Sequence, residues 1–380
     1  MGKSPISKVF QPLLVCYSLT MNKTVQTFLD LVRMNSVSGD EGLISLFLET
    51  KLLSLGLSTS WDEGENLYAY LPGEGDTILL SAHMDTVPLA YDVEPLVEEG
   101  LIHTRGITAL GADDKAAIAA ILTVLQDIQD EGLPHPNLVI LFSIKEELGL
   151  QGIAQVDTNK LSKVDHGYVF DAEGPVGTFI TAAPGSIKLD VTFQGKGAHA
   201  GFSPESGISA IQMASDAIAS MRLLRIDEET TANVGSFVAP GSRNIVCDKA
   251  TLSLEARSLD PKKLTEQIKH MKDCLQKAAK KHGGTVTIVE ELLYEAYSLD
   301  PNSEPFTQLK KACTALGLSY NEKPTLGGSD ANVLNAKGIP TVVCNTGYEA
   351  PHTVNESIQV DQLLALTSLV KELATIKETR

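Results

Sequence analysis

Length, composition and charge limit the class of protein before any motif is considered. The chain has 380 residues, 43% of them hydrophobic, and a mean hydropathy of +0.02, as in a soluble globular protein of about two domains. The formal net charge of −17 argues against nucleic acid and anionic membrane surfaces as partners, because both are bound by basic faces. We therefore expect neither partner.

The cysteines and the N-terminal segment bear on the compartment. Five scattered cysteines without a C-x-x-C pair are typical of a reducing compartment and not of a disulfide framework or a thiolate metal site, so we predict a cytoplasmic protein. No apolar run reaches the length of a membrane span. The stretch "VFQPLLVCYSL" imitates a secretory signal only weakly, because Gln11 and Pro12 interrupt it. We expect residues 1–20 to be a poorly ordered leader or an upstream start before Met21.

Helices and strands alternate in the first part of the chain. Helical spacing of apolar residues predicts helices over 24–34, 41–55 and 113–130. Strands are predicted over 66–73, 77–85, 137–144 and 166–174, and a loop over 88–100. The core-facing residues expected in the second helix are Leu43, Leu46, Phe47 and Leu53, with Gly56 as its end. The alternation predicts an α/β domain with a mixed, largely parallel sheet flanked by helices.

The pattern changes near Pro184 and changes back near residue 297. Between these points the predicted order is strand, helix, strand, strand, helix, strand, which is the ferredoxin-like βαββαβ unit. A helix, the strand "PTVVCNTG" and a terminal helix over 358–377 then resume the first pattern. We therefore predict a domain made of residues 21–183 and 297–380, with a second domain, residues 184–296, inserted into it.

Residues able to bind a metal follow the predicted strands, where open α/β sheets place their sites. His83 and Asp85 lie two apart in extended chain, so both project to the same side and Asp85 can orient the imidazole. Asp113 and Asp114 begin a helix, where an N-cap and a favourable interaction with the helix dipole are the ordinary alternative. Each short motif alone is compatible with a purely structural role.

The pair Glu146–Glu147 follows the apolar strand "NLVILFSI", where adjacent carboxylates repel unless something neutralises them. A solvated turn beside Lys145 is the ordinary explanation. In metal-assisted hydrolysis, one glutamate binds a metal and the other acts as general base, and the spacing does not say which does which.

The remaining metal-ligand candidates come from two later segments. The strand "HGYVFDAEG" supplies Asp171, with Glu173 as a competing candidate, and "GYEAPHTVNES" supplies His352, for which a surface loop is the alternative. Oxygen and imidazole ligands without thiolate suit Zn²⁺, Mn²⁺ or Co²⁺. Two carboxylates and one imidazole for each ion, with one carboxylate shared, would serve two divalent metals. The recurrence of such residues after strand upon strand predicts a dinuclear site.

The motifs "SAHMDTVP", "LGADDKAAIAAIL", "KEELGLQG", "GKGAHAG" and "GGSDANVL" resemble those of a known family in content and order. The sequence is similar to the dinuclear zinc exopeptidases and amidohydrolases that include peptidase T, carboxypeptidase G and aminoacylase. "GADDKA", "YVFDAEGPVG" and "SPESG" favour the peptidase T-like branch. The resemblance spans residues 81–352 and implies a zinc-exopeptidase catalytic domain with an inserted lid domain.

The resemblance implies a role for each candidate metal ligand. His83 and Asp171 would bind one ion, Glu147 and His352 the other, and Asp113 would bridge the two. It also implies a cis peptide after Asp113. One departure is Asp171, where the carboxypeptidase and aminoacylase branches usually carry glutamate, which argues against carboxypeptidase specificity.

The resemblance also implies the catalytic and substrate-binding residues. Glu146 would be the general base and Asp85 the partner of His83, while His199 would support the oxyanion, often from the partner subunit. Softer assignments to substrate binding are Arg257, Asn244, Gly327, Gly328 and Ser329.

We expect an aminopeptidase that acts on short peptides, releasing the N-terminal residue of tripeptides, as a homodimer formed through the lid domain. A dipeptidase, a carboxypeptidase or an N-acyl-amino-acid deacylase with the same dinuclear site is the alternative within the enzyme class. A metal-free peptide-binding protein on this scaffold is the alternative outside it.

Overall fold

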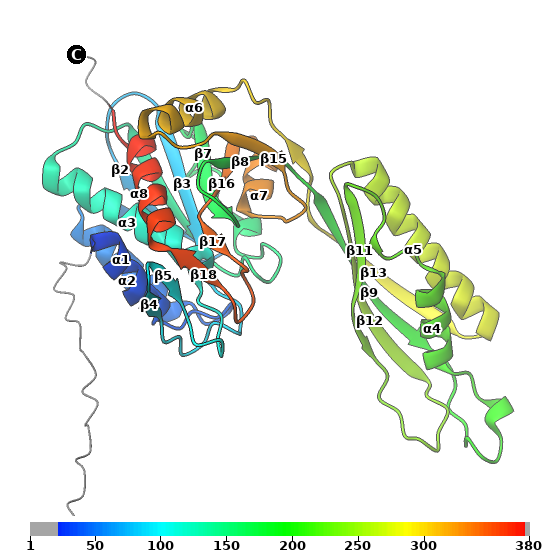
Figure 1. Ribbon diagram of the computed structural model, residues 1–380. Helices are drawn as coiled ribbons and strands as arrows, with labels where there is room; N and C mark the ends of the chain where they lie inside the picture. The colour runs from blue at the N-terminus through cyan, green and yellow to red at the C-terminus, as the bar shows by residue number, and fades with distance from the viewer. Residues whose placement is uncertain (1–21, 377–380) are drawn as a thin grey trace, which may run out of the picture.

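The computed structural model describes residues 22–376 as two bodies of different architecture (Figure 1). The larger is built on a nine-stranded sheet and the smaller on a five-stranded sheet. The leader predicted for residues 1–20 lies outside the described residues. None of the helices within residues 22–376 is long and apolar enough to cross a membrane.

The nine-stranded sheet is mixed, with a parallel centre. Its strands, in spatial order, are β1 (Ser58–Trp61), β2 (Leu67–Leu71), β6 (Asn137–Ser143), β3 (Thr77–His83), β7 (His166–Ala172), β16 (Thr341–Asn345), β8 (Thr178–Ala183) and β14 (Tyr297–Ser298), with β15 (Asn321–Pro324) also paired to β8. The pairs β6–β3, β3–β7 and β7–β16 are parallel, whereas β2–β6 and β16–β8 are antiparallel. The predicted fold class is confirmed, and the carboxyl ends of four parallel strands meet at one edge.

Both faces of this sheet are covered. The helices of the larger body are α1 (Lys23–Val32), α2 (Gly42–Ser54), α3 (Ala112–Glu131), α6 (Glu304–Leu316), α7 (Asp330–Ala336) and α8 (Val360–Ala374). Helix α3 packs with α1 and α8 in the main core, and α7 lies in a second core on the opposite face. Successive residues of β6 enter these two cores alternately, which explains why the whole strand is apolar.

The prediction for the buried face of α2 is wrong for three of its four residues, whereas Phe47 packs against the core as predicted. Leu43, Leu46 and Leu53 are 64%, 63% and 53% exposed, and the residues that enter the core are Ile44, Leu48 and Leu52. The helix is apolar on nearly every side, so its sequence offers two equally spaced stripes, and only the position of the sheet selects between them. Gly56, with φ +81°, follows the helix as predicted.

The segment 88–100, predicted as a loop, contains strand β4 (Leu96–Glu98). It pairs with β5 (Leu101–His103), and β5 pairs with β18 (Ser357–Gln359), which pairs with β17 (Tyr348–Glu349). These strands are only two or three residues long, so their apolar alternation is too short to be recognised in the sequence. This small sheet brings the segment around residue 350 to the same edge as α3.

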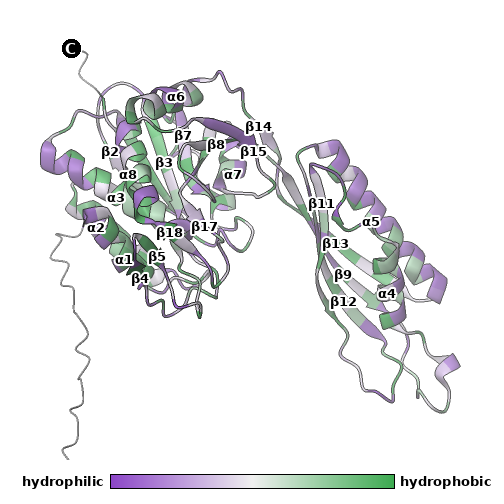
Figure 2. Ribbon diagram, viewed as in Figure 1, coloured by the Kyte–Doolittle hydropathy of each residue, from purple (hydrophilic) through white to green (hydrophobic). Residues whose placement is uncertain are grey.

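The smaller body has ferredoxin-like topology. Its strands are β9 (Gly185–Gln194), β10 (Leu224–Arg225), β11 (Thr230–Val238), β12 (Lys249–Ser258) and β13 (Thr285–Tyr294), in the antiparallel order β10-β11-β12-β9-β13. Helices α4 (Ala210–Ser220) and α5 (Pro261–His282) cover one face and enclose a separate core. Figure 2 shows the hydrophilic side of α5 turned away from the sheet.

Candidate metal centre

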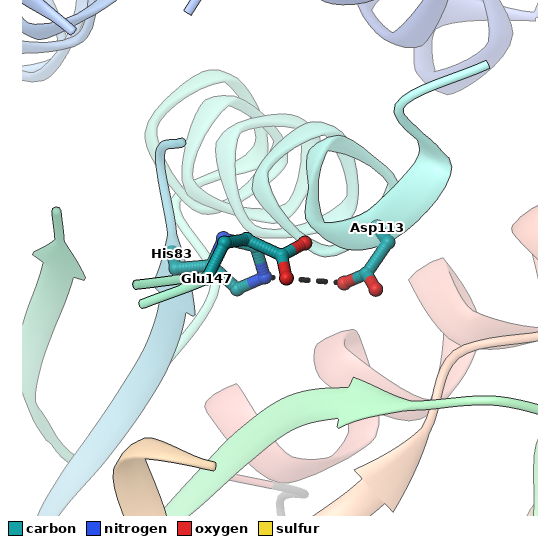
Figure 3. A group of neighbouring side chains, drawn as sticks. All are labelled: His83, Asp113 and Glu147. Carbon is teal, nitrogen blue, oxygen red and sulfur yellow. Dashed lines mark hydrogen bonds and ion pairs between the residues drawn. The ribbon is translucent and has the colours of Figure 1, made fainter. Parts of the chain in front are cut away.

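Three predicted ligands come together at the carboxyl edge of the parallel strands. His83 ends β3, Asp113 lies in the first turn of α3, and Glu147 follows β6 (Figure 3). One potential ligand atom from each lies within 4.8 Å of the other two. His83 Nε2 lies 3.1 Å from Asp113 Oδ1. The parallel register of β3 and β6 places His83 opposite Ser143, so the residues following β6 reach the same edge.

The two other predicted ligands adjoin this cluster. His352 Nε2 lies 3.2 Å from Asp113 Oδ2 and 2.8 Å from Glu147 Oε1. Asp171 Oδ1 lies 3.9 Å from His83 Nε2. The Asp113 carboxylate thus lies between two imidazoles and offers one oxygen to each, as a carboxylate shared by two ions must. The peptide bond from Asp113 to Asp114 is cis.

Asp85 organises both the imidazole and the glutamate pair. His83 Nδ1 lies 2.9 Å from the Asp85 backbone carbonyl and 3.4 Å from its Oδ1. The same carboxylate accepts hydrogen bonds from the backbone N–H groups of Glu146 and Glu147, at 3.0 and 3.3 Å, and from the Ser38 hydroxyl at 2.7 Å. A single buried side chain therefore sets the orientation of His83 and the direction in which the Glu146–Glu147 segment leaves β6.

The histidines of the cluster favour their charged forms. Hydrogen bonds that His352 donates to Asp113 and then to Glu147 raise the pKa of His352 to about 10. Burial opposes protonation of His83, but its hydrogen bonds to Asp113 and Asp85 outweigh burial and raise the pKa of His83 well above its usual range. Burial likewise works against ionisation of Asp113, but the two histidines prevail and hold its pKa below the usual value. The shared carboxylate is therefore an anion that attracts cations from two sides.

Two carboxyls of the site, Asp171 and Glu146, are crowded and resist ionisation. Burial and then the charge of Asp113 raise the pKa of Asp171 well above its usual range. Burial and then the charge of Asp171 raise the pKa of Glu146 in the same way. Among the described residues, no lysine or arginine forms an ion pair with Asp113, Glu147 or Asp171. The surplus of buried carboxylates beside two imidazoles fits divalent cations, which would neutralise charge that otherwise needs protons.

Further acidic residues, absent from the sequence prediction, support the cluster. Glu356, 1% exposed, accepts hydrogen bonds from the backbone N–H groups of Gly111 at 2.8 Å and Asp113 at 3.0 Å. Glu41 accepts the Lys145 backbone N–H at 3.2 Å. A signal for Glu356 existed, since it lies four residues after His352 in the same motif, but its partners lie more than 240 positions away.

Asp330 contacts the end of β6, from which the glutamate segment leaves. Its Oδ2 accepts a short hydrogen bond from the Ser143 hydroxyl at the end of β6, whereas its Oδ1 has no hydrogen-bond partner. Burial raises the pKa of Asp330 to about 6. Ser329, the N-cap of α7, forms a capping box with Asn332, and this positions Asp330 in the first turn.

The predicted residues of the smaller body lie at its two ends. Arg257 pairs with Ser186 near the start of β9, at the junction with the larger body (Figure 1). Arg257 Nη2 lies 3.1 Å from Glu255 Oε2. His199 follows the far end of β9, roughly 30 Å along that ten-residue strand. Asn244 is beside His199, because its carbonyl accepts the Ala200 N–H at 2.9 Å. The structure therefore does not bring His199 and Asn244 to the metal ligands of their own chain.

The imidazole of His199 is exposed and has a defined tautomer. Its Nδ1 accepts hydrogen bonds from the backbone N–H groups of Gly201 and Phe202, both at 3.1 Å. A nitrogen that accepts in this way carries no proton, so in the neutral imidazole the proton is on Nε2. The Phe202 ring, 87% exposed, lies with its centroid 4.5 Å from that of His199. His199 thus presents an N–H donor to its surroundings.

Gly327, Gly328 and Ser329 line a pocket of about 330 Å³ beside Asp113 and Asp171. Gly328 is required there for packing, because a Cβ at this position would clash with the Tyr294 ring. Tyr294 ends β13 at the junction, so this contact joins the two bodies.

The fold and the site define a class of protein: an α/β hydrolytic scaffold with a cluster of imidazole and carboxylate ligands at its sheet edge and an inserted ferredoxin-like body. Residues 79–375 match the model of peptidase family M20/M25/M40. The chain therefore belongs to this family, and the predicted enzyme class and peptidase T-like branch are confirmed.

Relatives and solved structures agree with this placement. An uncharacterised Bacillus subtilis protein, YqjE, is 38% identical over 94% of this chain and 98% of its own length. Peptidase T of Geobacillus kaustophilus is 26% identical over 91% of this chain and 93% of its own. The crystal structures of a Staphylococcus aureus tripeptidase (TM-score 0.86, 37% identity) and of the Bacillus cereus aminopeptidase PepT (TM-score 0.81, 36%) each cover 93% of this chain, and this chain covers 97% of each.

Proposed function

We propose that this protein is a metal-dependent exopeptidase that releases the N-terminal residue of tripeptides. The observation that carries the proposal is the Asp113 carboxylate between His83 and His352, with Glu146 and Glu147 at the adjoining strand end. The names of the similar enzymes, a tripeptidase and the aminopeptidase PepT, support the substrate class.

We assign the ligands of two divalent ions from the contacts within the cluster. His83 and Asp171 would hold one ion, and Glu147 and His352 the other, with Asp113 shared. When bound, the ions supply Lewis acidity, which polarises a peptide carbonyl and makes a water molecule more acidic. Oxygen and imidazole ligands suit zinc best in our proposal, with manganese or cobalt as substitutes.

The chain's own residues move the protons and hold the developing charge. Glu146 accepts a proton from the attacking water and returns it to the leaving amine, so the C–N bond breaks with no net change in the enzyme. Glu146 is held beside the ligand Glu147 because the Asp85 carboxylate accepts hydrogen bonds from the backbone N–H groups of both residues. The N–H of His199 Nε2 would donate to the oxyanion that forms on the substrate.

His199 lies at the far end of β9, so we propose that it acts on the site of a second subunit, in a homodimer formed through the smaller body. Its exposure leaves it free to do so. We further propose that residues 184–296 fold as this lid domain and that the enzyme is cytoplasmic. Sedimentation of the purified protein should show a dimer, and a monomer with full activity would contradict the proposal for His199.

One experiment tests the activity and its alternatives together. The enzyme is stripped with a chelator and assayed with Gly-Gly-Gly, with dipeptides and with N-acetyl amino acids, before and after addition of Zn²⁺, Mn²⁺ or Co²⁺. We expect hydrolysis of the tripeptide at its N-terminal bond to disappear with the metal and return with it. Undiminished turnover by the stripped protein would refute the proposal. Preference for a dipeptide or an N-acetyl amino acid would identify the dipeptidase or deacylase alternative.

A further inference from the structure

One pocket beside the candidate metal centre carries a charge that the proposed mechanism does not use. The pocket of about 330 Å³ is bordered at one end by the carboxylates of Asp113, Asp171 and Glu173, and its floor includes the apolar side chains of Ile180 and Val343. Among the described residues that line it, Lys323 has the only positively charged side chain. The pocket is therefore acidic beside the proposed metals and basic elsewhere.

The strand register places Lys323 over the pocket floor. On β15, Lys323 pairs with Ile180 of β8, and Ile180 pairs in turn with Val343 of β16. Paired residues of neighbouring strands point to the same face of a sheet, so these three side chains form a row. The row leads towards β7, where Val343 pairs with Val169. The register shifts after this pair, and Asp171, at the carboxyl end of β7, lines the same pocket as Val343.

The row also sets the distance between the two ends of the pocket. Three strand spacings separate the backbones of β15 and β7, which amounts to about 14 Å. Lys323 and Asp171 both line the pocket, so a peptide bound in it would lie between the ammonium and the carboxylate.

The Lys323 ammonium is not neutralised by a neighbour. Among residues 22–376 it has no carboxylate within ion-pair distance. The adjacent Glu322 pairs with Lys310 at 3.4 Å and accepts the Tyr320 hydroxyl, and adjacent residues of a strand point to opposite faces. A lysine ammonium of this kind is a point charge suited to a carboxylate.

We infer that Lys323 is a specificity-determining residue that binds a carboxylate of the peptide substrate. This inference rests on the proposed peptidase function and names the chemical group, a carboxylate, that the pocket binds. Two carboxylates of a tripeptide could reach Lys323: the side chain of an N-terminal Glu or Asp, or the free C-terminus. The scissile carbonyl lies at the proposed metals in both cases, and the carboxylate extends along the apolar row.

The test compares wild type, Lys323→Gln, Lys323→Glu and a matched control, Lys337→Gln, which changes an exposed lysine outside the pocket. The substrates are Glu-Gly-Gly, Gln-Gly-Gly, Gly-Gly-Gly and Gly-Gly-Gly-amide. For a partly solvated ion pair, we expect K323Q to lower kcat/KM about three- to fivefold for carboxylate-bearing substrates. K323E should lower it further, and K337Q should leave it unchanged.

The pattern of losses identifies which carboxylate is bound. A loss confined to Glu-Gly-Gly assigns the N-terminal side chain, whereas an equal loss on every peptide except the amide assigns the C-terminus. For each substrate, kcat/KM of the wild type is divided by kcat/KM of K323Q. If this quotient were the same for all four substrates, the inference would be overturned and the proposed function would stay intact.

If the wild type cleaved none of these peptides, the proposed function would fail instead. The inference would then be tested by binding, measured as the rise in Tm that each peptide causes. The rise with Glu-Gly-Gly is compared with the rise with Gln-Gly-Gly, and the rise with Gly-Gly-Gly is compared with the rise with Gly-Gly-Gly-amide. A larger rise for a carboxylate-bearing peptide in wild type but not in K323Q would support the inference, and equal rises would overturn it.

Discussion

The metal cluster and the far end of the smaller body present candidate catalytic groups in opposite ways. In the cluster, Asp85 is fully buried and makes four contacts, two with His83 and one each with the backbone N–H groups of Glu146 and Glu147. At the far end of the smaller body, His199 is exposed, and its imidazole contacts only its own turn, through two N–H groups and the exposed Phe202 ring among the described residues.

The difference follows from what each group must meet. Buried carboxylates need partners because desolvation and mutual repulsion are unfavourable, so a metal site is built from many elements that brace one another. A donor that meets a substrate from outside has to remain exposed until the substrate and a second subunit surround it. The cluster should therefore be sensitive to changes in several supporting residues, and the exposed histidine only to changes in itself.

The largest effect is expected from Glu146→Gln. Removing the base should lower kcat by about 10²–10⁴-fold, the usual contribution of general base catalysis, while both metal equivalents stay bound. Metal analysis of the purified variant provides the check. Loss of metal together with activity would show that the roles of Glu146 and Glu147 are reversed.

His199→Ala tests the other half of the comparison. Loss of an oxyanion donor should lower kcat by about 10²–10³-fold, with metal content and Tm unchanged because the side chain is exposed. Mixing this variant with Glu146→Gln should restore part of the turnover, since a mixed dimer would contain one complete site. A mixture with no more activity than its components would contradict a contribution from the second subunit.

Glu356→Gln probes the support of the shared ligand. The amide cannot accept hydrogen bonds with both of its atoms, so one of the N–H groups of Gly111 and Asp113 loses its acceptor. We expect metal affinity to fall about 10–100-fold, with kcat restored by excess metal and KM unchanged. Competition with a chromogenic chelator measures the affinity. Glu349→Gln, which changes an exposed glutamate, serves as control. An equal loss of metal affinity in that variant would show that Glu356 has no specific role.

A buried lysine beneath the cluster is expected to affect stability and not catalysis. Burial lowers the pKa of Lys115 to about 7, and its ammonium donates to the Met34 carbonyl at 2.6 Å. Between pH 7 and the unfolded value of 10.5, the folded protein holds the neutral amine and the unfolded chain the charged one. Stability therefore rises with pH across this window.

Replacing this amine gives the measurement. The free energy of unfolding of the metal-free wild type, relative to Lys115→Met, should increase between pH 7 and pH 10. Parallel pH profiles for the two proteins would show that the amine keeps its charge in the folded state.

Part of the fold was readable from local pattern. The alternation of strands and helices, the βαββαβ order and the apolar strand β6 are properties of short segments, and the structure contains all of them. The buried face of α2 and the strands of the small sheet, which are two or three residues long, could not be predicted from the sequence. The first depends on which side the sheet lies, and the second on partners far along the chain.

The sequence by itself determined the kinds of ligand, because imidazole and carboxylate groups follow strand after strand in motifs of a few residues each. Tertiary structure alone decided how they meet: that Asp113 lies between two imidazoles, that Glu356 and Asp85 hold the backbone of the ligand segments, and that Lys323 lies in the same pocket. The physical reason is distance along the chain. Parallel strands bring residues from distant segments to one edge, and burial then makes each charge depend on neighbours that no local pattern names.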